Sequence, residues 1–148
     1  MTTADLAPDP GYVDFYKVKT GLWSWLTTTD HKRIGIMYLI GMVVFFLVAA
    51  GLGIAMRLEL LKPGEEFMDG ALYNRVLTLH GVIMIFLFII PGIPAIFGNF
   101  FLPIQIGAQD VIFPRINLAS WYCYVIGGLL GVFSIFLGGV DTGWTFYV

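Results

Sequence analysis

The stretch IGIMYLIGMVVFFLVAAGLGIAM, residues 34–56, contains no charged side chain and decides the class of fold. As an α-helix, its 23 residues would be about 34 Å long, enough to cross the roughly 30 Å of hydrocarbon in a bilayer. Residues 76–101 and 118–140 form two further apolar stretches of similar length. We therefore predict an all-α integral membrane protein with three transmembrane helices.

The composition of the whole chain agrees with this class. Of 148 residues, 58% are hydrophobic and only 12% are charged, whereas a soluble domain usually has roughly 25% charged residues. The charged residues gather in short clusters between the apolar stretches. The net charge of −2 gives no reason to expect a nucleic-acid partner. We expect a lipid bilayer to surround the apolar stretches.

Residues 1–33 are predicted to be a cytoplasmic or interfacial segment that precedes the transmembrane region, residues 34–148. Tyr, Trp and Thr side chains are frequent at 15–30, which suits the headgroup level. Thr29 or Asp30 can cap the first long helix. Five Lys and Arg residues lie on the amino-terminal side of the membrane and three lie on the other. This excess predicts that the amino terminus is cytoplasmic.

Two features should shape the second and third helices. Pro91 and Pro94 are expected to kink the second helix near its far end, because proline removes a backbone hydrogen bond. In the third helix, Gly127 and Gly131 have the G-x-x-x-G spacing that lets helix backbones approach each other closely in lipid.

His80 lies about one turn inside the second apolar stretch. Ionisable side chains inside a membrane are costly and usually face a site or a cavity. One interpretation is a neutral histidine that is hydrogen-bonded to another helix. The other is a ligand of haem iron or of a metal, since a neutral imidazole is a common ligand of both. His31 precedes the first stretch, so a second intramembrane haem ligand would have to come from another helix. Arg57, at about the same depth, is either an interfacial anchor or a partner for a group at His80.

Asp110 follows the second apolar stretch, and polar residues flank it at both helix ends. An acidic residue in a loop is usually just solvated, and Asn99, Asn117 and Ser120 could be ordinary capping residues. The same set could instead order a chain of water molecules that leads into the bundle.

Taken together, several motifs resemble subunit I of the haem–copper terminal oxidases, most closely the cytochrome c oxidase branch. In chain order these motifs are Thr29-Asp30-His31-Lys32, Arg57-Leu58-Glu59, Lys62-Pro63-Gly64, Tyr73-Asn74, Phe97-Gly98-Asn99, Gly107-Ala108-Gln109-Asp110, Phe113-Pro114-Arg115-Ile116-Asn117 and Asp141-Thr142-Gly143-Trp144-Thr145. The resemblance, in the order and spacing of these motifs, extends over roughly residues 25–148. Asp30 departs from the Asn that is common in this family, and Gln109 stands where Pro usually precedes the acid.

The resemblance implies roles for individual residues. His80 would be an axial ligand of the low-spin haem, which makes it the iron ligand of this chain, and Arg57 would bond to a substituent of the haem ring. Trp144 and Tyr147 would lie near the haem edge. Glu59 with Gly64 is similar to a peripheral calcium or sodium site of some members.

The same resemblance implies a proton-uptake path. Asp110 would be its mouth, and Asn99, Asn117, Ser120 and Tyr38 would order its water.

The implied protein is subunit I of a terminal respiratory oxidase, which passes electrons through haem to O₂, reduces it to water and pumps protons. This chain would supply the first three of about twelve helices. Its cofactor would be a low-spin haem, with haem A the expected type, while the second haem and the copper would be bound by later helices. The catalytic residues would also lie outside this chain. We therefore expect the chain to be inactive alone, as a truncated or split product would be.

The expected partners are the rest of subunit I, the other oxidase subunits and an electron donor, cytochrome c or a quinol. The expected location is a bacterial inner membrane rather than a mitochondrial one. Two alternatives remain open: a quinol oxidase of the same superfamily, and a non-catalytic membrane scaffold or transporter fragment in which His80 is structural.

Overall fold

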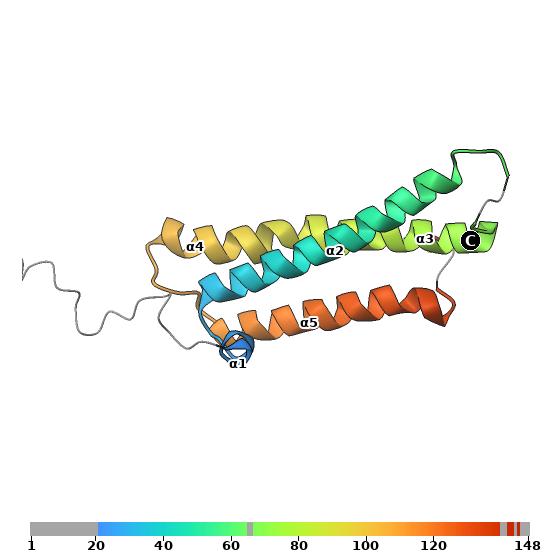
Figure 1. The fold of residues 1–148 in the computed structure, drawn as a ribbon. Coiled ribbons are helices and arrows are strands. Elements are labelled where there is room, and N and C mark those ends of the chain that lie inside the picture. The colour runs from blue at the N-terminus through green and yellow to red at the C-terminus, as the bar shows by residue number, and fades with distance from the viewer. Residues whose placement is uncertain (1–20, 65–66, 140–141, 144, 146–148) are drawn as a thin grey trace, which may run out of the picture.

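The computed structural model describes residues 21–64, 67–139, 142–143 and 145. Every regular element in these residues is helical, which confirms the predicted all-α fold. The elements are α1 (Leu22–Leu26), α2 (His31–Glu59), α3 (Gly70–Val82), the π-helical η2 (Ile83–Ile89) and η3 (Gly92–Phe97), α4 (Gly98–Ile106), α5 (Pro114–Phe133) and the 3₁₀-helical η4 (Ser134–Leu137). Helices α2 and α5 run in one direction and α3 to α4 runs in the other (Figure 1).

Three helical stretches in the described part of the chain are long and apolar enough to cross a membrane: His31–Glu59, Gly70–Ile106 and Pro114–Leu137. This confirms the three predicted helices, although each is longer than its apolar run. The extra turns carry polar residues, and the first two stretches begin at side-chain caps. Asp30 accepts a hydrogen bond from the Lys32 backbone N–H at 2.9 Å, as predicted. Asp69 accepts one from the Leu72 N–H at 2.7 Å in the same way.

The second stretch continues past its prolines instead of ending there. The backbone winds as a π-helix in η2, before Pro91, and again in η3, which contains Pro94. An α-helix would pair the Leu87 carbonyl with the N–H of residue 91, which proline lacks. In the structure, the Tyr124 hydroxyl of α5 donates to this carbonyl oxygen at 2.7 Å. A change of winding and a donor from a neighbouring helix thus accommodate Pro91, and the predicted kink stays a prediction.

The glycines of α5 pack differently from the expectation. A Cβ added at Gly127 or Gly131 would meet no described atom within 4 Å, so the predicted G-x-x-x-G pair is not a contact in this structure. Gly128 is instead the buried glycine, and a Cβ there would overlap the ring of Phe45 on α2. Which glycine of α5 contacts α2 depends on where α2 lies. The spacing of glycines within α5 alone does not give that position.

Three buried clusters in the described part of the chain hold α2 against the other helices, and two of them involve its middle and its amino-terminal half. One contains Phe45 and Ala49 from α2 with Leu79 and Ile83 from the second stretch. The other contains Ile34, Tyr38 and Ile96. Many large apolar side chains on the outer faces remain exposed among the described residues, as expected where lipid or further helices cover a bundle.

Helix α1 lies across the end of the bundle, where Figure 1 shows it end-on. The buried Arg33 side chain of α2 connects the two helices. Its guanidinium donates to the Ser24 hydroxyl at 3.0 Å and lies 5.2 Å from the centre of the Trp25 ring. This position fits the predicted interfacial segment, of which residues 15–20 are outside the described residues. The predicted boundary at residue 33 stays a prediction.

Candidate functional site

His80 is half-buried on α3 and faces α2. Its Nδ1 lies 2.8 Å from the backbone carbonyl oxygen of Ala49. A carbonyl oxygen can only accept, so Nδ1 is the donor and carries the proton. In a neutral imidazole this leaves Nε2 with a free lone pair. The arrangement agrees with both interpretations of the sequence: the ring is hydrogen-bonded to a neighbouring helix, and one nitrogen remains able to bind a metal.

Arg57 lies on the same side of α2 as this contact. Ala49, Gly53 and Arg57 follow one another at intervals of four residues, which places them along one face of a helix. Long side chains of a helix lean toward its amino terminus, so the Arg57 side chain leans toward the level of His80. The residue is exposed, and no hydrogen bond from its guanidinium to a described side chain is observed.

Asp110 lies at the opposite end of the bundle and pairs with His31. The His31 Nδ1 is 2.8 Å from Oδ1 of Asp110, and the same oxygen accepts the Val111 N–H at 2.7 Å. The His31 side chain is 6% exposed and that of Asp110 is 44% exposed, so one partner is buried and the other reaches solvent. A protonated His31 makes this contact an ion pair. The sequence placed His31 before the first helix and did not predict this pair, because its partner is 79 residues away.

Asn99 and Asn117 join α4 to α5 by a reciprocal amide pair. Asn117 Nδ2 donates to Asn99 Oδ1, and Asn99 Nδ2 donates to Asn117 Oδ1 at 3.3 Å and to the Ala95 carbonyl at 2.6 Å. Asn99 is only 4% exposed. The pair satisfies polar groups that would otherwise be costly in an apolar surrounding.

Tyr38 and Ser120 continue the polar contacts from this pair to α2. Ser120 donates to the backbone carbonyl oxygen of Asn117 at 2.7 Å, and the Tyr38 hydroxyl lies 2.8 Å from Ser120 Oγ. Since the single hydroxyl proton of Ser120 is used, Tyr38 is the donor in the second bond. The polar residues predicted together are therefore close together: Asn99, Asn117, Ser120 and Tyr38 form one connected set.

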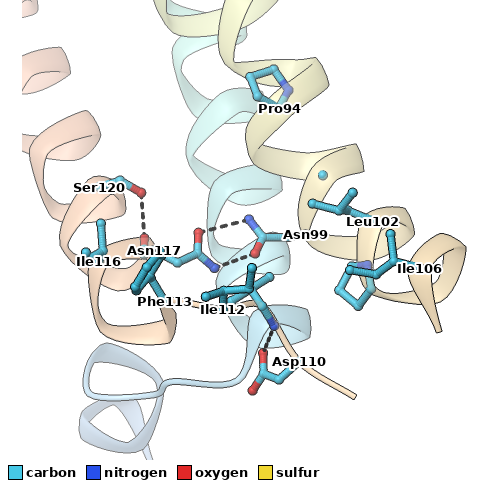
Figure 2. Close-up of a pocket in the computed structure, with 13 residues that line it drawn as sticks. Pro94, Asn99, Leu102, Ile106, Asp110, Ile112, Phe113, Ile116, Asn117 and Ser120 are labelled. Atoms are coloured by element: carbon cyan, nitrogen blue, oxygen red, sulfur yellow. Dashed lines mark hydrogen bonds between the residues drawn. The ribbon is translucent and has the colours of Figure 1, made fainter. Parts of the chain in front are cut away.

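A pocket of about 380 Å³ lies between α4, α5 and the loop that joins them. Figure 2 shows Asp110 at the loop end of this pocket and the Asn99–Asn117 pair farther along the helices. Ser120 also lines the pocket, and most of the remaining lining is apolar. Asp110 makes no described hydrogen bond to the amide pair, so a connection between them requires water in the pocket.

Glu59 closes the loop after α2. Its Oε2 accepts the backbone N–H groups of Phe67 and Met68, both at 3.1 Å, and the carboxylate is buried. Gly64 has φ +115°, a left-handed conformation suited to glycine. No group of three His, Cys, Asp or Glu side chains within the described residues could hold a metal ion. The calcium or sodium site at Glu59 and Gly64 stays an expectation from the resemblance.

Trp144 and Tyr147 lie outside the described residues. Their neighbour Gly143 donates its N–H to the Thr78 hydroxyl at 3.0 Å, and Thr78 donates to the Asn74 carbonyl at 2.8 Å. Thr78 thus holds residue 143 against α3, the helix that carries His80.

Comparison with known proteins identifies the family of this chain. A family model described as Cytochrome C and Quinol oxidase polypeptide I matches residues 33–148. The chain belongs to this family. Its three apolar helices make the chain an integral membrane protein.

The curated relatives that the chain matches are named as oxidase subunits. The chain is 46% identical to cytochrome c oxidase subunit 1 of Alkalihalophilus pseudofirmus, over 88% of this chain and 21% of the relative. It is 47% identical to cytochrome c oxidase subunit 1 of Bacillus sp. (strain PS3), over 85% of this chain and 20% of the relative. It is 40% identical to heme-copper oxidase subunit I+III of Aeropyrum pernix, over 85% and 16% respectively. The chain thus spans about a fifth of the length of the first two relatives.

Proposed function

We propose that this chain is the amino-terminal part of subunit I of a terminal respiratory oxidase that reduces O₂ to water and pumps protons. Within that enzyme it provides an axial ligand of a low-spin haem, His80, and a proton-uptake entrance, Asp110. The observation that carries the ligand assignment is the hydrogen bond from His80 Nδ1 to the Ala49 carbonyl. It leaves Nε2 as the nitrogen that can bind iron, and such a second partner commonly fixes the tautomer and orientation of a histidine ligand.

The residues around His80 fit a haem group. A bound haem would supply one-electron transfer, and the protein would set its reduction potential through ligands, hydrogen bonds and local charge. His80 would hold the iron through Nε2. Arg57, on the same face of α2 as Ala49 and Gly53, would neutralise or hydrogen-bond a polar substituent of the ring. Trp144 and Tyr147 would add contacts at the haem edge, and haem A is the expected type.

The second site would bring protons into the bundle. Asp110 is the exposed acid at the pocket, and His31 holds one of its oxygens. Behind it, the amide pair, Ser120 and Tyr38 provide donors and acceptors at which water can be ordered. The buried indole N–H of Trp121 has no acceptor among the described residues and packs beside the cluster that contains Tyr38. A water molecule is the ordinary partner of such a group, which supports a hydrated path here.

The remaining assignments follow from the family. The second haem and the copper would be bound by other helices of subunit I, and the other oxidase subunits would complete the enzyme. The electron donor would be cytochrome c, as in the names of the first relatives, with a quinol as the alternative because the family includes quinol oxidases. The membrane would be a bacterial inner membrane with the amino terminus in the cytoplasm. A calcium or sodium ion would bind at Glu59 and Gly64, as in some members of the family.

Two variants of the complete oxidase separate the proposed roles. His80→Ala should abolish the low-spin haem absorption, because it removes the iron ligand. Asp110→Asn should keep that absorption but slow turnover strongly and abolish proton pumping, because it removes the titratable group at the entrance. The measurements are visible spectra of the purified enzyme, oxygen consumption, and external acidification by reconstituted vesicles given a reductant.

Each variant is the control for the other. An unchanged low-spin spectrum in assembled His80→Ala enzyme would refute the ligand assignment and favour a structural histidine. Normal turnover with a normal proton-to-electron ratio in Asp110→Asn enzyme would mean that Asp110 is only a solvated loop acid. Turnover with reduced cytochrome c, compared with turnover with a quinol, would decide between the two donors.

A further inference from the structure

The imidazole ring of His80 lies directly against Gly53 of α2. A Cβ added at Gly53 would lie 3.1 Å from Cε1 of the ring and 3.4 Å from Nδ1. Carbon atoms in optimal contact are roughly 3.5–4.0 Å apart, so an added methyl group would push the ring away. One turn earlier on the same face, Ala49 accepts the hydrogen bond from Nδ1 at 2.8 Å. The ring therefore lies so close to α2 that a side chain at residue 53 would make it shift by a few tenths of an ångström.

We propose that Gly53 is a positioning residue for His80: its missing side chain lets the imidazole approach α2 closely enough for Nδ1 to reach the Ala49 carbonyl. The inference rests on the proposed role of His80 as a haem ligand. It extends that role by naming the residue on a different helix that determines the position and the hydrogen bond of the ligand.

The hydrogen bond gives this contact chemical consequences. Donation from Nδ1 fixes the tautomer, restrains the rotation of the ring and increases the basicity of Nε2. A methyl group at residue 53 would displace the ring by a few tenths of an ångström, and this shift should lengthen the bond to the Ala49 carbonyl. A more weakly hydrogen-bonded imidazole donates less to ferric iron, so the reduction potential of the haem should rise.

A purely structural reading of Gly53 is that small residues help helices pack in lipid. Gly51, two residues earlier in α2, provides the matched control for that reading. A Cβ added at Gly51 would meet no described atom within 4 Å. Gly51→Ala and Gly53→Ala thus make the same chemical change in the same helix and gain the same helix propensity. Only the second change touches the imidazole.

The experiment compares Gly53→Ala, Gly51→Ala and His80→Ala in the complete oxidase. The readouts are the low-spin haem absorption band, the electron paramagnetic resonance g-values of the ferric low-spin haem, which respond to the orientation of the axial ligand, and the midpoint potential. For Gly53→Ala we expect shifted g-values, a shifted band and a higher potential. For Gly51→Ala we expect wild-type values in all three measurements.

The outcomes are distinguishable. If both glycine variants match wild type, or both shift equally, while His80→Ala loses the low-spin haem, the positioning role is wrong and the proposed function stands. If His80→Ala keeps its low-spin haem, the proposed function fails and this inference fails with it. If Gly53→Ala does not accumulate in the membrane, the amount of the double variant Gly53→Ala/His80→Ala in the membrane tests the positioning role instead. Accumulation of this double variant to the level of His80→Ala supports a clash with the ring, and a lower level overturns it.

Discussion

Tyr38 and Tyr124 both lie in membrane-spanning helices, but their hydroxyl groups have different kinds of partner. Tyr38 bonds to the Ser120 hydroxyl at 2.8 Å, beside the amide pair. Tyr124 donates to the Leu87 backbone carbonyl at 2.7 Å. Tyr38→Phe should therefore slow proton uptake, because it removes a hydroxyl from the proposed path. Tyr124→Phe should leave the uptake rate unchanged and lower the free energy of unfolding by about 1 kcal/mol, the typical value of one hydrogen bond.

The two tyrosine variants are measured side by side in the complete oxidase. Oxygen consumption and acidification by vesicles report proton uptake, and thermal unfolding in detergent reports stability. Equal slowing by both substitutions would show that the path does not run through Tyr38 in particular. Unchanged turnover in Tyr38→Phe would remove Tyr38 from the path.

Single residues differ in how visible their roles are in the sequence. His80 stands out because an ionisable group interrupts an apolar run. The structure shows the expected hydrogen bond between His80 and a neighbouring helix. His31 does not stand out, because it lies beside charged residues and its partner Asp110 is distant in the chain. Gly53 is equally hidden, since Gly51 has the same surroundings in sequence and lacks the contact. Such roles depend on which residue of another helix lies opposite, and a single sequence does not contain that information.

Gly128 determines how closely α5 approaches α2. A methyl group at this position would overlap the buried ring of Phe45. Gly128→Ala should lower the free energy of unfolding by about 1–3 kcal/mol, as overpacking of a core usually does. Gly127→Ala is the matched control and should have almost no effect, since no described atom lies within 4 Å of the added Cβ.

Thermal unfolding of the complete oxidase in detergent measures both variants. The Phe45→Leu substitution makes room at the contact, so the double variant Phe45→Leu/Gly128→Ala should lose less stability than the sum of its parts. Strict additivity of the two losses would show that Gly128 and Phe45 do not constrain each other.

The lengths of the elements were easier to predict than their winding. Apolar runs determine which residues can lie in hydrocarbon, so the three helices were predicted in the right order with ends that differ by only a few residues in α2 and more in the second stretch. The π-helical turns η2 and η3 were not predicted. The Leu87 carbonyl, which loses its α-helical donor at Pro91, accepts instead from Tyr124, and that donor is known only when α5 is in place.

The orientation of the chain in the membrane can be tested by labelling its two loops. The Lys and Arg counts predict that the loop between α2 and α3 is outside and the loop between α4 and α5 is inside. Leu61 and Ile112 are 68% and 81% exposed in these two loops and carry no charge. In a Cys123→Ser background, Leu61→Cys should react with an impermeant maleimide added to intact cells, and Ile112→Cys should not.

Permeabilised cells provide the control for the labelling experiment, because both cysteine variants should react once the reagent reaches both sides. Labelling of Ile112→Cys but not of Leu61→Cys in intact cells would reverse the orientation. That result would also place Asp110 on the side from which protons are released, and the proposed uptake entrance would have to be abandoned.

His80 and Asp110 lie at opposite ends of the second stretch, and this separation has an electrical consequence. From residue 80 to residue 106 the chain would rise about 39 Å as an α-helix, somewhat less with the π-helical turns, which is comparable to the thickness of the hydrocarbon. Under the proposed function, a proton that enters at Asp110 and reaches the level of His80 therefore crosses most of the transmembrane voltage. A potential of 100 mV changes the energy of one such charge by about 2.3 kcal/mol. Turnover of the intact enzyme should accordingly slow as the membrane becomes energised, and Asp110 lies where that sensitivity would begin.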